Sequence, residues 1–218
     1  MKDKPLNGYK AVIYDCDGVM FDSLESNFIF YSKILEHFGV PPLDRNNEEI
    51  MHLLHTSASR EVLAQLFAGD ERSEAAVSFA DTIDYRDLLP FMQMEAGFRE
   101  TVEALQDTVR LAICTNRSTS MEMVLEYFGL TPYFSCVMTA SRVNNPKPHP
   151  EPLLKVLEYF AIKPGEALFV GDSELDCRAS HAAGVPFIAY KADMPCLARI
   201  DRHEDILPLL RAEKKGDF

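Results

Sequence analysis

Two aspartates stand one residue apart in the stretch AVIYDCDGVMFDS, residues 11–23, directly after a run of apolar residues. Like charges repel, and burying an unpaired carboxylate costs free energy. Asp15 and Asp17 are therefore either an incidental solvated pair or a pair held together by something cationic. Because carboxylate oxygens are ligands that Mg²⁺ prefers, the second reading predicts a metal site.

The surrounding pattern predicts the elements that would position this pair. Residues 9–14 have the composition of a short buried strand. Further helices are expected at 98–107, 119–128, 151–160 and 174–183, each leading into a short apolar segment: VRLAICT, SCVMTA, EALFVG and VPFIAY. Helices that alternate with almost wholly apolar strands indicate a parallel sheet covered on both faces. Apolar residues at three- and four-residue steps predict only helices in 22–89. We therefore expect an α/β core domain, 1–21 and 90–218, with a helical domain of residues 22–89 inserted into it.

Polar side chains follow four of the predicted strands. They are Asp15, Asp17, Thr115, Asn116, Arg117, Lys147, Asp172 and Asp176. Ligands of an open parallel sheet bind at the carboxyl ends of its strands, so these residues should share one edge. A hard metal held by Asp15, Asp172 and a backbone carbonyl would neutralise the acidic cluster and attract a phosphate. Without it, a carboxylate 4 Å from one negative charge would be repelled by about 4 kcal/mol at an effective dielectric of 20. Mg²⁺ and Lys147 would thus be necessary parts of a phosphate site.

Composition limits the classes of partner. The 218 residues include 22 Lys and Arg against 34 Asp and Glu, a net charge of −12, which argues against nucleic acid or an anionic membrane as a partner. No apolar run approaches the roughly 18 residues that a membrane span needs. The N-terminal segment lacks the apolar core of a signal peptide, so we expect a cytoplasmic protein. Five scattered cysteines without a CxxC pair predict reduced thiols rather than disulfides or a zinc site.

The motifs resemble those of the haloacid dehalogenase-like (HAD) superfamily. DCDGVMFDS is similar to its first motif, Thr115 to the second, Lys147 to the third, and GDSELD, residues 171–176, to the acidic fourth. They occur in this order from Asp15 to about Tyr190. The helical insert between the first two motifs resembles the subgroup that contains phosphoglycolate phosphatase and β-phosphoglucomutase. The resemblance implies a Rossmann-like HAD core with a parallel sheet and an inserted all-α cap domain.

The resemblance also implies a function: a Mg²⁺-dependent phosphatase that acts on a small phosphorylated metabolite. Asp15 would attack phosphorus and form an aspartyl-phosphate. Asp17 would protonate the leaving oxygen and then accept a proton from the hydrolytic water. Thr115 would hydrogen-bond the phosphoryl oxygens, and Lys147 would neutralise their charge. Asp15, Asp172 and the backbone carbonyl of Asp17 would hold the metal.

Three further residues are candidates for supporting roles or substrate contacts. Asp176 either supports the metal site or caps the helix that follows, together with Ser173 as N-cap. Asn116 stands beside Thr115 at the same strand end. Arg60 resembles an arginine-bearing specificity segment of related caps, or is an ordinary exposed helix charge.

Four other residues carry weaker signals. His52 and His55, spaced HxxH, could suggest a metal, but with no third ligand nearby we expect an ordinary cap helix. Arg117 and His149 lie near the predicted site and could touch substrate, although the sequence assigns neither a role.

Several family activities fit less well. True haloacid dehalogenases lack the second aspartate, here Asp17, and no lysine lies between Lys33 and Lys147 to form the Schiff base of a phosphonoacetaldehyde hydrolase. A β-phosphoglucomutase-like sugar-phosphate mutase remains the alternative, although Asn27 stands where such sequences tend to have histidine and TNRST departs from their Ser-Ala-Ser-Lys type of run. A non-catalytic HAD-fold binding protein also remains open, but such proteins usually lose the nucleophile, the lysine or the metal aspartates.

Overall fold

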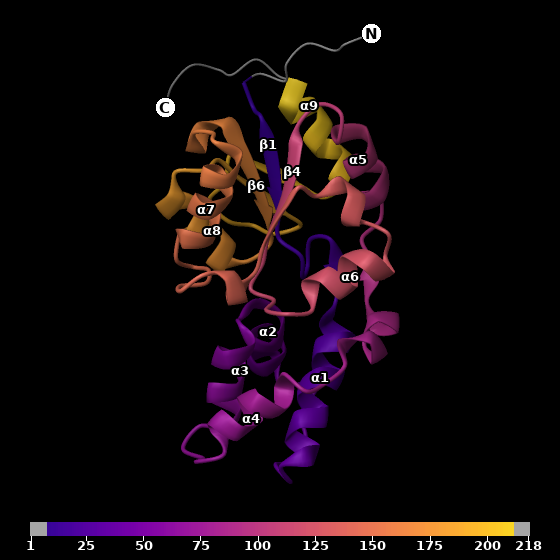
Figure 1. Ribbon diagram of the computed structural model, residues 1–218, viewed down its shortest axis with the longest axis vertical. Coiled ribbons are helices and arrows are strands. Elements are labelled where there is room, and N and C mark those ends of the chain that lie inside the picture. Colours follow the sequence, from indigo (N-terminus) through magenta and orange to yellow (C-terminus); the bar gives the residue numbers. More distant parts are fainter. Residues whose placement is uncertain (1–7, 212–218) are drawn as a thin grey trace.

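The computed structural model describes residues 8–211 and contains one six-stranded parallel sheet (Figure 1). Residues 1–7 and 212–218 lie outside the described part of the chain. The expectation that the N-terminal segment is not a signal peptide rests partly on residues 1–7. The strands are β1 (Ala11–Tyr14), β4 (Arg110–Cys114), β5 (Cys136–Met138), β6 (Ala167–Gly171), β7 (Phe187–Tyr190) and β8 (Ala198–Ile200). Their order in the sheet is β5-β4-β1-β6-β7-β8. The central position of β1 places the aspartates that follow it in the middle of the carboxyl edge.

Helices cover both faces of this sheet, because successive residues of a strand point to opposite sides. One face packs against α5 (Phe98–Leu105), α6 (Met121–Tyr127) and α9 (Ile206–Arg211), and the other against α7 (Glu151–Phe160) and α8 (Glu174–Ala183). Val12 and Tyr14 belong to the first hydrophobic cluster, and Ala11 and Ile13 to the second. The expected α/β class and the parallel sheet covered on both sides are confirmed.

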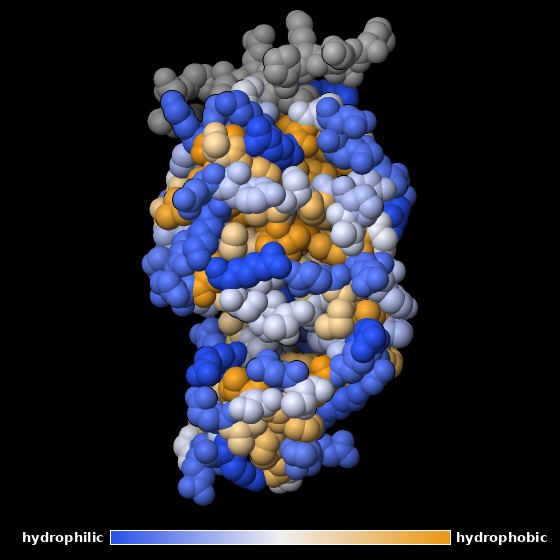
Figure 2. Space-filling view, viewed as in Figure 1, coloured by the Kyte–Doolittle hydropathy of each residue, from blue (hydrophilic) through white to orange (hydrophobic). Residues whose placement is uncertain are grey.

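Four helices form a separate layer beyond the carboxyl edge of the sheet (Figure 1). They are α1 (Leu24–His37), α2 (Glu48–Thr56), α3 (Ser59–Leu66) and α4 (Ser73–Ala80). Their buried side chains make a hydrophobic cluster of their own, distinct from the two clusters of the sheet. Short 3-10 helices lie at Tyr85–Asp87, Leu89–Phe91, Thr131–Tyr133, Ala140–Arg142, Pro164–Glu166 and His203–Asp205. Hydrophobic surface patches occur over both the sheet layer and the helical layer, within a mostly hydrophilic exterior (Figure 2).

The chain passes between the two parts through a small antiparallel ribbon, β2 (Phe21–Asp22) paired with β3 (Gln93–Met94). We propose that the helical part is a cap domain of residues 22–89 and that residues 1–21 and 90–218 form the core domain. The separate hydrophobic cluster of the helices and the position of the ribbon support these boundaries.

Two elements near the C-terminal end, β8 and α9, were not predicted. The strand has only three residues, and just one of them, Ile200, is buried. All five cysteines are free, four of them buried, in agreement with the expected thiols. Between residues 8 and 211, no helix has both the length and the apolar character needed to cross a membrane.

Candidate active site

The loop after β1 fixes the two aspartates at the edge of the sheet. The backbone N–H of Asp15 donates to the carbonyl of Val170 at 2.9 Å, which extends the ladder between β1 and β6. Gly18 then turns the chain with a φ of +75°, and a Cβ atom there would overlap a carboxylate oxygen of Asp172 and lie 2.6 Å from Nε2 of His55. Glycine is therefore required at this point of the loop both by the backbone conformation and by the close approach of neighbours.

Lys147 joins two carboxylates in the interior of the site. Its Nζ lies 2.8 Å from Oδ1 of Asp15 and 2.6 Å from Oδ1 of Asp176, and the residue is only 4 % exposed. Its backbone N–H donates to Oδ1 of Asn116 at 3.0 Å, and its carbonyl accepts from Nδ2 of Asn116 at 3.1 Å. The amide that follows Thr115 thus holds the backbone of the lysine loop, so Asn116 positions Lys147.

Asp176 both caps a helix and contacts the site. Ser173 is the N-cap of α8: its Oγ accepts from the backbone N–H of Asp176 at 3.2 Å. The Oδ2 atom of Asp176 accepts in return from the backbone N–H and the hydroxyl of Ser173. The other oxygen of this fully buried carboxylate accepts from Lys147. The capping reading of Asp176 is thus confirmed, and its contact with Lys147 places it beside Asp15, while its support of a metal site stays a prediction.

Three carboxylates gather closely enough to share a cation: Asp15, Asp172 and Asp176 each offer an oxygen within 4.8 Å of the others. Burial, reinforced by the charge of Asp176 and opposed by Lys147, raises the pKa of Asp15 to about 8. Burial also raises the pKa of Asp172. Carboxylates that resist ionisation for these reasons fit a divalent cation, which would remove the repulsion between them. Both oxygens of Asp176 already accept hydrogen bonds, from Lys147 and from Ser173. Asp15 and Asp172 are therefore the better candidate ligands for a metal ion.

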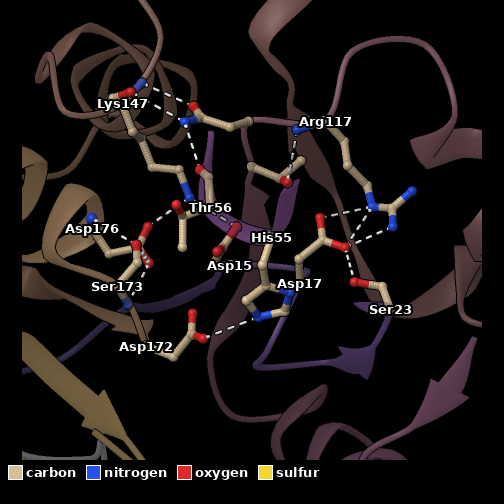
Figure 3. Close-up of polar contacts among 12 residues, drawn as sticks. Asp15, Asp17, Ser23, His55, Thr56, Arg117, Lys147, Asp172, Ser173 and Asp176 are labelled. Atoms are coloured by element: carbon tan, nitrogen blue, oxygen red, sulfur yellow. Dashed lines mark hydrogen bonds and ion pairs between the residues drawn. The ribbon is translucent and has the colours of Figure 1, made fainter. Parts of the chain in front are cut away.

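Asp17 lies on the side of Asp15 that faces away from Lys147, and there it pairs with Arg117 (Figure 3). Its Oδ2 accepts from Nε of Arg117 at 2.8 Å, its Oδ1 accepts from Nη2 at 2.6 Å, and the hydroxyl of Ser23 also donates to it. Although burial acts to raise the pKa of Asp17, the charge and hydrogen bonds of Arg117 hold it below its usual range. The backbone N–H of Arg117 donates to Oγ1 of Thr115 at 3.1 Å, which places the buried threonine beside this ion pair.

His55 reaches the acidic cluster from helix α2. Its Nε2 lies 3.5 Å from Oδ2 of Asp172. Burial acts to lower its pKa, but the hydrogen bond to Asp172 and the charge of Asp17 outweigh burial and raise the pKa to about 9. His55 does lie on a helix, as expected, but the sequence did not predict its contact with Asp172. The HxxH spacing was the only signal in the sequence, and it did not indicate which histidine would face the sheet.

A cavity of about 80 Å³ lies between the helical part and the sheet edge. Its wall includes Asp15, Asp17, Thr115, Asn116 and Arg117 from the sheet side, and Asn27, Leu54, His55, Ser57 and Tyr85 from the helical side. Arg60 is not among the lining residues: its side chain is 70 % exposed and its Nη1 lies 3.0 Å from Oε1 of Glu74. His149, which the sequence placed near the site, is also absent from the wall, and its Nδ1 accepts from the backbone N–H of Glu151. The structure brings together the other predicted residues: Asp15, Asp17, Thr115, Asn116, Arg117, Lys147, Asp172 and Asp176.

Residues 12–190 match the family model described as Haloacid dehalogenase-like hydrolase. Because this match spans most of the chain, the chain belongs to that family. The similar solved structures include a HAD-superfamily hydrolase of subfamily IA, variant 1, from Geobacter sulfurreducens. It shares 59 % sequence identity and a TM-score of 0.83, with 92 % of this chain and 99 % of that chain covered.

Two curated relatives carry the name phosphoglycolate phosphatase. The one from Chromobacterium violaceum is 30 % identical over 194 residues, which cover 84 % of this chain and 86 % of that protein. The one from Escherichia coli K12 is 43 % identical over 91 residues, which cover 41 % of this chain and 36 % of that protein. The match with the Escherichia coli relative therefore spans about a third of that protein's length.

Proposed function

We propose that this chain is a Mg²⁺-dependent phosphatase that hydrolyses a small phosphate monoester through an aspartyl-phosphate on Asp15. The observation that carries the proposal is the buried contact of 2.8 Å between Lys147 and Asp15, at the sheet edge where Asp172 adds a second carboxylate. This arrangement pairs a nucleophile with a fixed cation. The relatives named phosphoglycolate phosphatase support a substrate of this class.

The reaction has two steps, each with its own proton transfer. In the first, a carboxylate oxygen of Asp15 bonds to phosphorus while the bond from phosphorus to the leaving oxygen breaks, and Asp17 gives that oxygen a proton. In the second, the oxygen of a water bonds to phosphorus while the bond from phosphorus to Asp15 breaks, and Asp17 takes a proton from that water. Inorganic phosphate leaves and both aspartates return to their starting state. Two carboxylates one residue apart can thus perform different tasks, because only one of them forms a covalent bond.

The other side chains bind and orient the phosphoryl group. Lys147 balances the charge of Asp15 and of the phosphoryl oxygens, and the hydroxyl of Thr115 donates a hydrogen bond to one of them. Asn116 keeps the lysine loop in place through its two backbone contacts. Asp15, Asp172 and the backbone carbonyl of Asp17 would hold Mg²⁺, which would neutralise phosphoryl charge as a Lewis acid.

We also propose the cytoplasm as the compartment in which this enzyme works. All five cysteines are free thiols, which is typical of proteins kept in a reducing environment.

Phosphate release from a panel of small esters tests the proposal. The panel contains phosphoglycolate, sugar phosphates, nucleoside monophosphates and pyrophosphate, each with and without Mg²⁺. We expect Mg²⁺-dependent release that Asp15→Asn abolishes. Conversion of a sugar 1-phosphate to its 6-phosphate without net release would instead identify the mutase, and the absence of both reactions in folded protein would contradict an enzymatic role.

A further inference from the structure

Arg117 is the one lysine or arginine in the cavity wall among the residues that the structure describes. The acidic residues of that wall are Asp15, Asp17 and Asp81. Lys147 lies outside the wall and is already shared between two carboxylates. His55 also lines the wall, but its Nε2 already faces Asp172 at 3.5 Å. A ligand with a second negative charge, beyond the phosphoryl group, would therefore find Arg117 as its cationic partner in the cavity.

The guanidinium of Arg117 is held in a fixed position. Its Nη1 lies 3.2 Å from the hydroxyl oxygen of Ser120, and its central carbon lies 5.0 Å from the centre of the Tyr85 ring. The residue is only 8 % exposed. A buried guanidinium needs an anionic partner, and in this structure Asp17 is that partner.

This pairing conflicts with the task proposed for Asp17. While both oxygens of Asp17 accept from Arg117, and one also accepts from Ser23, the carboxyl group is not available to the leaving oxygen. Releasing Asp17 alone would leave the guanidinium buried without a counter-charge, which is costly. A substrate that brings its own anion would replace Asp17 at Arg117 and free the carboxyl group at the same time.

We propose that Arg117 is a specificity-determining residue that binds a second anionic group, a carboxylate or phosphate, on the leaving part of the substrate. This inference rests on the proposed phosphatase function and names its substrate class. Figure 3 shows the required geometry: Lys147 lies on one side of Asp15 and Arg117 on the other. The first cation serves the transferred phosphoryl group, and the second selects the leaving group.

A pair of matched ligands tests the inference by binding alone. Phosphoglycolate carries a carboxylate, and 2-hydroxyethyl phosphate carries a neutral hydroxyl at the corresponding position. Calorimetry with the Asp15→Asn protein and Mg²⁺ measures both affinities without turnover. We expect phosphoglycolate to bind about 10- to 100-fold more tightly, as a charge-assisted contact implies. Adding Arg117→Gln should abolish this preference, whereas Arg117→Lys should keep part of it.

Arg86→Gln is the matched control. Arg86 is an exposed arginine next to Tyr85 that pairs with Asp84 outside the cavity wall. Its substitution removes the same charge and should leave the preference unchanged.

Three outcomes overturn the inference: equal affinity of the two ligands, an equal loss of both on Arg117→Gln, or no binding of either at millimolar concentration. The proposed function fails separately, if wild-type protein with Mg²⁺ releases no phosphate from either ester.

Discussion

Replacing Lys147 with methionine removes the charge that separates two buried carboxylates while keeping most of the side-chain volume. The Nζ atom lies 2.8 Å from Asp15 and 2.6 Å from Asp176. At an effective dielectric of 20, each contact is worth about 6 kcal/mol of attraction. Because desolvation of the ammonium offsets much of this, removing one partner of such a group costs about 3–5 kcal/mol.

Urea unfolding of the metal-free protein measures this cost at pH 9, above the pKa of about 8 to which burial and Asp176 raise Asp15, so that both carboxylates face Lys147 in ionised form. With a slope of about 2–3 kcal/mol per molar urea, Lys147→Met should lower the unfolding midpoint by about 1–2 M, and Mg²⁺ should restore part of the loss. Lys155→Met is the control, because Lys155 pairs with Glu151 at the edge of the surface, where its side chain is 39 % exposed. If Lys147→Met shifts the midpoint no more than Lys155→Met does, the reasoning about the buried carboxylates is refuted.

Three further outcomes are expected. Gly18→Ala should displace Asp172 and so weaken Mg²⁺ binding measured by calorimetry. Gly39→Ala is the control, because Gly39 has a similar φ of +64° and no neighbour within 4 Å. It should cost only about 1–2 kcal/mol of stability and leave the Mg²⁺ affinity intact. Because the folded pKa of Asp15 is raised to about 8, the native state binds an extra proton between about pH 4 and 8. The free energy of unfolding of the metal-free wild type, relative to that of Asp15→Asn, should therefore fall as pH rises through this window. Urea unfolding at several pH values measures this difference, and a difference that does not change with pH would contradict the prediction. Burial lowers the pKa of His203 to about 4, so the stability it contributes is present above about pH 6.5 and lost as pH falls towards 4. His203→Gln should remove that part of the acid dependence in a pH series of thermal unfolding.

The sequence predicted the fold where the pattern was local and repeated. Helix α8 begins and ends as expected, at residues 174 and 183, because its capping residues and apolar spacing are encoded within the segment itself. Strand β8 has only three residues and packs at the edge of the sheet against Phe187–Tyr190. Its local pattern is too short to distinguish a strand from a loop, so only the neighbouring strand determines it.

The site divides in the same way. Asp15, Lys147 and Asp176 could be placed together because parallel strands deliver their carboxyl ends to one edge. The pairing of Arg117 with Asp17 joins residues a hundred positions apart, and the approach of His55 depends on the angle at which a helix of the insert meets the sheet. No periodicity encodes either contact, because both are set by the relative placement of the two parts.

The pairing of β2 with β3 has a consequence for how such a protein can change. Asp22 lies directly opposite Gln93, so the two ends of the intervening 70 residues emerge side by side from the sheet layer. An insert whose ends already meet can be lengthened, shortened or exchanged with little added cost of loop closure. The four helices of the insert could thus be exchanged as a unit: a different set could be joined at this ribbon while the loop that carries Asp15 kept its course.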